Sequence, residues 1–261
     1  MNGQPVGMAS LSLGAGPPLL LLPGLTPDHE PPTGTDRWFQ LRSMRRLAPA
    51  RQVWWVNRRR GLAEGTTMAD LAEDYATMLR EWQAPPIDVV GVSTGGSVAL
   101  QLAADHPQVV RRLVLVASGC RLGPQGHAGQ RRAIEALERG DRRTAAAILM
   151  ELAAAGRLTR AALRAAGWLV PSLVVARDTH DLRVTMQAED AFDLADRLQS
   201  ISAPTLVIGG DRDAYYGEGV FRETADALPF GHLVLLPGAG HAATVADRHL
   251  GEQVDAFLGH R

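Results

Sequence analysis

The sequence of 261 residues contains no lysine and only one cysteine. All 27 basic residues are arginines, which excludes catalysis through a lysine Schiff base. The single cysteine, Cys120, excludes an internal disulfide bond and a cysteine-rich metal site, and we expect no metal or organic cofactor. A net charge of −1 gives no reason to expect nucleic acid or an anionic membrane as a partner. We expect a small-molecule substrate, with the choice between monomer and homodimer left open.

Long hydrophobic runs are lacking as well. The most apolar stretch, residues 17–25, contains four consecutive leucines but is too short to span a bilayer. The first arginine is Arg37, so no positively charged region precedes the leucines as it does in a secretory signal peptide. We therefore expect a cytoplasmic protein in which the leucines form a buried strand.

Hydrophobic residues make up 46 % of the chain, which together with its length fits one globular α/β domain with an insertion. Short apolar stretches that predict strands alternate with stretches of helical periodicity. The predicted strands cover residues 8–13, 19–22, 52–57, 87–92, 113–117, 205–208 and 232–236, and the predicted helices residues 35–47, 67–82, 94–105, 219–228 and 244–258. Apolar strands alternating with helices predict an α/β fold with a mainly parallel sheet flanked by helices.

The alternation stops between residues 121 and 203. This segment is rich in alanine and arginine and has no convincing buried strand. Helical stretches lie near residues 130–139, 142–155, 159–168 and 178–198. We interpret residues 121–203 as a helical cap inserted into a core that residues 1–120 and 204–261 form.

A Gly-Val-Ser-Thr-Gly segment at residues 91–95 follows the apolar run at 87–90. A strand, a Gly-x-Ser-x-Gly turn and a helix make a nucleophile elbow, in which Gly91 and Gly95 permit the tight turn. The turn exposes the Ser93 hydroxyl and directs it to the start of the next helix, where N–H groups can stabilise negative charge. Ordinary glycine-rich turns share this pattern, so the assignment depends on a base and an acid elsewhere.

The candidate base is His241, which follows the last predicted strand. In a parallel sheet that position lies at the carboxyl edge, where ligands bind. Two carboxylates follow the preceding strand, in the segment Gly-Gly-Asp-Arg-Asp at residues 209–213. Asp213 lies far enough along this loop to turn back to His241, whereas Asp211 is better placed to cap the turn or to pair with Arg212. We favour Asp213 as the acid that orients the imidazole, with Asp211 as the alternative.

The order Ser93, Asp213, His241 resembles the α/β-hydrolase superfamily, in its cap-bearing, esterase-like branch. The resemblance covers nearly the whole chain, because the elbow, the acidic loop and the Gly-His segment fall on the matching elements. It implies a serine nucleophile, a histidine base and no cofactor. A serine at position 93 argues against the branch that uses an aspartate nucleophile.

The resemblance also implies an oxyanion hole made of two backbone N–H groups, those of Leu25 and Thr94. Many relatives carry His-Gly in the loop before the first donor, whereas this chain has Pro23-Gly24. Thr26 could replace the missing histidine by hydrogen bonding, although a hydroxyl that only stabilises the turn is the simpler interpretation.

Candidate substrate-binding residues are less specific, because each also fits a core position. His29 follows the oxyanion loop, where a surface position is the simpler expectation than contact with substrate. The arginines of the cap are typical of a helix face exposed to solvent. The alternative is that they attract an acidic partner or a carrier protein. The candidate pocket residues are Trp38, Trp168, Met186, Phe192 and Tyr215, and the cap arginines are Arg131, Arg132, Arg139, Arg142 and Arg143.

The resulting hypothesis is a serine hydrolase that cleaves a carboxylic ester, a lactone or a thioester through an acyl-enzyme on Ser93. The alternative is a cofactor-free lyase, C–C bond hydrolase or cyclase that uses the same three residues. A noncatalytic binding protein is the third reading, which the complete Ser-Asp-His set disfavours.

Overall fold

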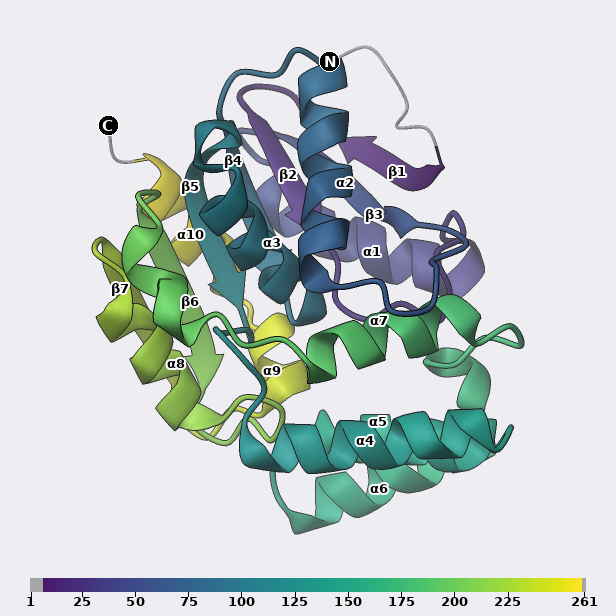
Figure 1. Ribbon diagram of the computed structural model, residues 1–261. Coiled ribbons are helices and arrows are strands. Elements are labelled where there is room, and N and C mark those ends of the chain that lie inside the picture. Colours follow the sequence, from purple (N-terminus) through teal and green to yellow (C-terminus); the bar gives the residue numbers. More distant parts are fainter. Residues whose placement is uncertain (1–6, 260–261) are drawn as a thin grey trace.

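The computed structural model describes residues 7–259 and contains a seven-stranded sheet (Figure 1). The strand order is β1-β3-β2-β4-β5-β6-β7, with β1 antiparallel to β3 and every other neighbouring pair parallel. This arrangement confirms the predicted α/β class. The strands are β1 (Met8–Leu13), β2 (Pro18–Leu22), β3 (Gln52–Arg59), β4 (Ile87–Val92), β5 (Val110–Val116), β6 (Thr205–Gly210) and β7 (Gly231–Leu236).

The leucines of β2 are buried on both faces of the sheet. Leu20 and Leu22 pack in the larger hydrophobic core, whereas Leu19 and Leu21 pack in the smaller one. Side chains alternate between the two faces of a strand, so a strand covered on both sides reads as a continuous apolar run. The four leucines therefore form a central strand, as the sequence predicts.

Helices cover both faces of the sheet (Figure 1). The larger core includes α2 (Met68–Glu81), α3 (Thr94–Asp105) and α8 (Gly217–Ala227), and the smaller core includes α1 (Gly34–Leu47) and α10 (Leu250–Gly259). Thr67 begins α2 with a capping box to Asp70, which satisfies backbone N–H groups at the helix start.

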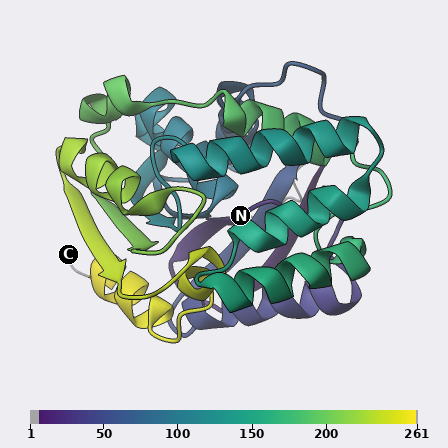
Figure 2. The ribbon, with the colours of Figure 1, turned by 90° about the horizontal axis from the view of Figure 1, so that it is seen from below.

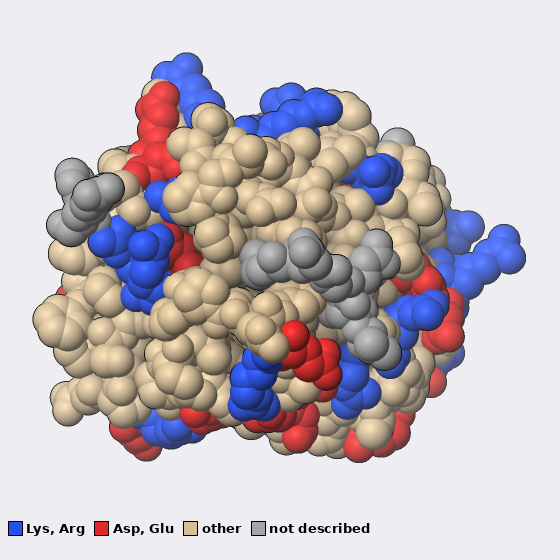
Figure 3. Space-filling view, turned by 90° about the horizontal axis from the view of Figure 1, so that it is seen from above, with Lys and Arg blue, Asp and Glu red and all other residues tan. Residues whose placement is uncertain are grey.

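Four helices lie between β5 and β6, at the carboxyl edge of the sheet. They are α4 (Pro124–Glu138), α5 (Arg142–Leu152), α6 (Arg157–Leu169) and α7 (His180–Asp190). Figures 1 and 2 show α7 next to the sheet and α4, α5 and α6 as a layer beyond it. On the opposite face of the molecule, acidic and arginine side chains are interspersed (Figure 3).

Two of the predicted helices each correspond to two separate elements. The stretch 178–198 contains α7 and a separate 3₁₀ turn, Ala195–Ser200, because the intervening backbone pairs elsewhere. Asp193 forms a bridge with Arg121, and the Leu194 N–H donates to the Cys120 carbonyl at 2.9 Å. The final stretch 244–258 is likewise two helices, α9 (His241–Val245) and α10, because the Asp247 carboxylate accepts the His249 N–H and forms a turn between them.

Candidate active site

Ser93 lies in the tight turn between β4 and α3 with φ of 51°, a strained conformation for a residue other than glycine. A Cβ atom on Gly91 would lie 2.5 Å from the Gly96 Cα, and one on Gly95 would collide with the carbonyl oxygen of Leu22. Only glycine fits both positions. The elbow therefore depends on glycines, which have no side chain, at the points where the strand, the loop and the helix approach each other closely.

Ser93, His241 and Asp213 form a hydrogen-bonded series. The Ser93 Oγ lies 2.9 Å from His241 Nε2, and His241 Nδ1 lies 2.8 Å from Asp213 Oδ2. A carboxylate only accepts, so Nδ1–H donates to Asp213 and Nε2 is left to accept from the Ser93 hydroxyl. The other Asp213 oxygen accepts the N–H groups of Tyr215 and Tyr216 at 2.7 and 3.1 Å. Both ends of the imidazole are thus oriented for proton transfer from serine.

The structure separates the two candidate acids. Asp213 is buried against His241, whereas Asp211 is exposed and accepts the Gly238 N–H at 2.7 Å. Asp211 therefore closes the turn after β7, and the geometry brings Asp213 to the imidazole.

The loop that carries Gly24 and Leu25 lies beside Ser93. A Cβ atom on Gly24 would be 3.3 Å from the Ser93 Cβ, so glycine allows this close approach. Thr94 occupies the first position of α3, directly after Ser93. The two residues expected to supply the oxyanion N–H groups therefore adjoin Ser93, Leu25 through the loop of Gly24 and Thr94 along the chain, and their role stays a prediction.

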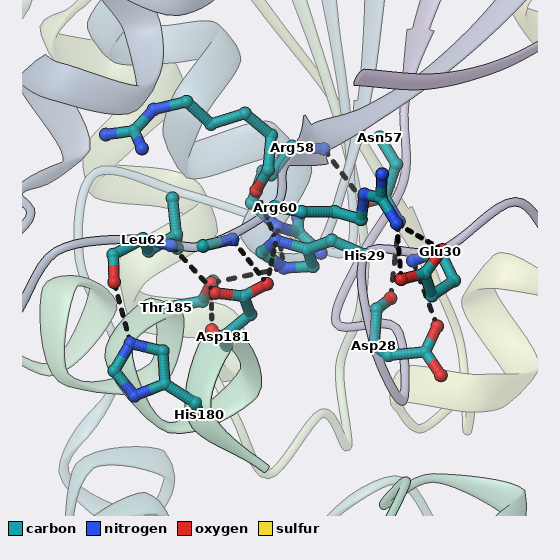
Figure 4. Close-up of polar contacts among 12 residues, drawn as sticks. Asp28, His29, Glu30, Asn57, Arg58, Arg60, Leu62, His180, Asp181 and Thr185 are labelled. Atoms are coloured by element: carbon teal, nitrogen blue, oxygen red, sulfur yellow. Dashed lines mark hydrogen bonds and ion pairs between the residues drawn. The ribbon is translucent and has the colours of Figure 1, made fainter. Parts of the chain in front are cut away.

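Arg58, at the end of β3, is a site residue that sequence reasoning missed (Figure 4). Its buried guanidinium donates to the carbonyl oxygens of Pro23 and Gly24 at 3.1 and 2.9 Å, and to the Thr26 hydroxyl at 3.3 Å. Burial lowers the pKa of Arg58. The run of three arginines at 58–60 resembles a solvated turn, so no sequence signal marked Arg58 as internal.

The Thr26 hydroxyl stabilises the same loop, because it donates to the Asp28 carbonyl at 2.6 Å and accepts from the Asn57 amide at 3.1 Å. His29 is buried, with 1 % of its surface exposed, so the expectation of a surface histidine is wrong. Its Nδ1–H donates to the Arg59 carbonyl at 2.7 Å, and its Nε2 accepts from Arg58 Nε at 3.2 Å. Burial and the Arg58 charge lower the pKa of His29 to about 4, so the ring is neutral at pH 7.

Glu189 of α7 is the second residue that sequence reasoning missed. Its buried carboxylate accepts the hydroxyl groups of Thr94, Tyr216 and Ser97 at 2.8, 3.0 and 3.4 Å. Burial raises the pKa of Glu189, and the hydrogen bonds from Thr94 and Tyr216 oppose that rise. The sequence around Glu189 mixes polar and apolar residues and gave no sign that this side chain is buried. Its place next to the start of α3 follows only from the contacts between α7 and α3.

The five candidate pocket residues occupy different environments. Tyr215 lies beside the imidazole, with 4.6 Å between the ring centres of Tyr215 and His241. Met186 and Phe192 pack in the larger hydrophobic core, and Trp38 lies on the surface of α1 under Arg42. Trp168 lines an open groove of about 800 Å³ that α4, α5 and α6 form. The structure brings only Tyr215 of this set against His241, and the pocket roles stay predictions.

Within residues 7–259, no group of three or more His, Cys, Asp or Glu side chains is arranged to hold a metal ion. Over the same range, none of the helices is both long and apolar enough to cross a membrane.

The fold is that of an α/β hydrolase, and it brings Ser93, His241 and Asp213 into one hydrogen-bonded series. The sequence profile described as alpha/beta hydrolase fold matches residues 17–245, and the chain belongs to this family. A relative from Variovorax paradoxus, named "Putative carbamate hydrolase RutD", is 32 % identical over 191 residues, which are 71 % of this chain and 70 % of the relative. Family membership and hydrolase relatives support an enzyme.

Solved structures show the same fold. An alpha/beta hydrolase enzyme, MGS-M2, from a Medee basin deep-sea metagenome library superimposes with a TM-score of 0.82 at 18 % identity, covering 97 % of this chain and 94 % of that one. The enol-lactonase from Burkholderia xenovorans superimposes with a TM-score of 0.79 at 20 % identity, covering 97 % and 96 %.

Proposed function

We propose that the protein is a serine hydrolase that cleaves a carboxylic ester, with lactones and thioesters as chemically related substrates. The observation that carries this proposal is the continuous series from Ser93 through His241 to Asp213. In this arrangement a neutral imidazole accepts the serine proton and a buried carboxylate stabilises the imidazolium that forms.

The mechanism follows from these positions. Ser93 Oγ attacks the carbonyl carbon while His241 Nε2 takes its proton, and the oxyanion binds the N–H groups of Leu25 and Thr94. The imidazolium then protonates the leaving alkoxide as the acyl–oxygen bond breaks. A water molecule, activated by His241, hydrolyses the acyl-enzyme and restores Ser93. Carbamate and enol-lactone, the substrates in the relatives' names, also contain a carbonyl carbon bonded to oxygen.

We further propose that residues 121–203 act as the cap of this site. The Tyr215 hydroxyl donates to the Leu149 carbonyl of α5 at 2.9 Å, and the Ala242 N–H donates to the Ala153 carbonyl at 2.9 Å. Both contacts join residues next to the acid or the base to the inserted helices. The insertion is therefore well placed to enclose a substrate.

The test is intact-mass spectrometry after treatment with a fluorophosphonate, with hydrolysis of p-nitrophenyl esters measured in parallel. We expect one adduct on the wild type and on Ser200→Ala, an exposed serine control. Ser93→Ala should take no adduct and lose ester turnover by a factor on the order of 10⁴ to 10⁶. Full activity in Ser93→Ala, or a folded wild type with neither adduct nor turnover, would reject acyl-enzyme chemistry and favour the lyase or cyclase alternative.

A further inference from the structure

Two buried charged side chains flank Ser93 without belonging to the proposed triad. Arg58 is 1 % exposed and Glu189 is 2 % exposed. A buried charge is costly unless hydrogen bonds compensate for lost hydration, so a network that satisfies two of them at one site calls for an explanation.

Arg58 acts on the peptide group that contains the first expected oxyanion donor. The carbonyl oxygen of Gly24 and the N–H of Leu25 belong to one peptide unit, and in a trans peptide they point in opposite directions. The guanidinium donates to this oxygen at 2.9 Å and to the preceding carbonyl, of Pro23, at 3.1 Å. Arg58 therefore fixes the rotation of the peptide and polarises it, which makes the Leu25 N–H a stronger donor.

Glu189 acts on the residue that carries the second donor. One carboxylate oxygen accepts the Thr94 hydroxyl at 2.8 Å, which ties the first residue of α3 to α7. The other accepts the Tyr216 hydroxyl at 3.0 Å, and the Tyr216 N–H in turn donates to Asp213. Glu189 thus links the start of the elbow helix to the loop that holds the acid.

We propose that Arg58 and Glu189 are positioning residues that hold the two sides of the oxyanion hole, Arg58 through the Gly24–Leu25 peptide and Glu189 through Thr94. This assignment rests on the proposed serine hydrolase function. The two charges are opposite and each favours the ionised form of the other, so the pair also offsets part of its own burial cost.

The test compares Arg58→Lys, Glu189→Gln, Thr94→Val and the Glu189→Gln/Thr94→Val double variant. Lysine keeps the positive charge, but its ammonium group cannot donate to the Pro23 and Gly24 carbonyls at the same time, as the guanidinium does. In the wild type the hydroxyl groups around Glu189 donate to two carboxylate oxygens, whereas a glutamine side chain offers them only one acceptor oxygen. Removing a whole oxyanion donor costs about 100- to 1,000-fold in kcat, so misplacing one should lower kcat by about ten- to a hundredfold with KM within about twofold. The double variant should lose little more than either single variant.

A trifluoromethyl ketone provides the readout that a purely structural role would not change. Its adduct with Ser93 places an oxyanion in the hole, so its inhibition constant should rise by the same factor as kcat falls. Circular dichroism and the melting temperature establish that each variant is folded. The controls are Arg60→Gln and Asp190→Asn. Arg60 pairs with Glu30 at the surface, and the partly buried Asp190 pairs with Arg131 and His127, outside the hydrogen bonds that surround Ser93, so both variants should keep wild-type kcat.

The outcomes separate the two proposals. A wild type that takes the fluorophosphonate and hydrolyses esters, but whose Arg58→Lys and Glu189→Gln variants keep kcat and inhibitor affinity, overturns the positioning role alone. A wild type with neither adduct nor turnover overturns the proposed function and the positioning role together. A parallel fall in kcat and inhibitor affinity supports both.

Discussion

Helices α6 and α7 both lie between β5 and β6 in the chain but differ in how they contact the core. Among the described residues of α6 only Gly167 is buried, and Leu169 is 65 % exposed. Six residues of α7 are buried, including Leu182 and Glu189. Apolar side chains on α7 thus reach the main core, whereas those on α6 lie largely in solvent.

The polar contacts differ in the same way. The Asp181 carboxylate of α7 accepts the N–H groups of Gly61 and Leu62 at 3.0 and 2.8 Å (Figure 4), and Glu189 reaches Thr94. Arg164 of α6 pairs with Glu151 of α5, within the insertion. Helix α7 therefore supports the residues around Ser93, whereas α6 is a peripheral layer.

Asp213 and Asp211 lie in one loop, the first buried and the second exposed, and here we expect the greatest change in activity. Asp213→Asn should lower kcat by about 10,000-fold, because the amide favours the wrong imidazole tautomer and cannot stabilise the imidazolium. Asp211→Asn should change kcat by less than about threefold, because Asp211 only closes an exposed turn. Steady-state kinetics on a p-nitrophenyl ester measures both. The reverse ranking would make Asp211 the acid.

Matched leucine truncations test the two helices directly. Leu182→Ala on α7 should lower the free energy of unfolding by about 2–4 kcal/mol, because a side chain that is 1 % exposed leaves a cavity in the core. Leu169→Ala on α6 should change it by less than about 0.5 kcal/mol. Urea unfolding provides both values. Equal losses would show that α6 is as firmly packed as α7 in solution.

A pH-dependent effect of similar size comes from His29, which lies between Arg58 and α7. The unfolded chain binds a proton on this histidine below about pH 6.5, whereas the folded protein does so only near pH 4. Stability contributed by neutral His29 should therefore be lost as the pH falls from 6.5 to 4, by an amount on the order of 3 kcal/mol. Urea unfolding across this range should show a shallower loss in His29→Gln. Parallel curves for the two proteins would refute a buried, neutral His29.

Much of the fold was predictable because its signals are local. The run of leucines in β2 predicts a strand that is buried on both faces. The glycines around Ser93 predict a tight turn between a strand and a helix. Helix ends were less predictable, since the breaks after α7 and after α9 come from the pairing of Asp193 with Arg121 and from the Asp247 turn.

The order of strands and helices, the turn at Ser93, and an acid and a histidine after successive strands could all be inferred from the amino-acid sequence. These features depend on side-chain size and polarity over a few neighbouring residues. Which aspartate contacts His241 became clear from the folded chain alone, as did the burial of Arg58, His29 and Glu189. Burial and pairing of charged groups depend on contacts between segments far apart in the chain, which no local pattern specifies.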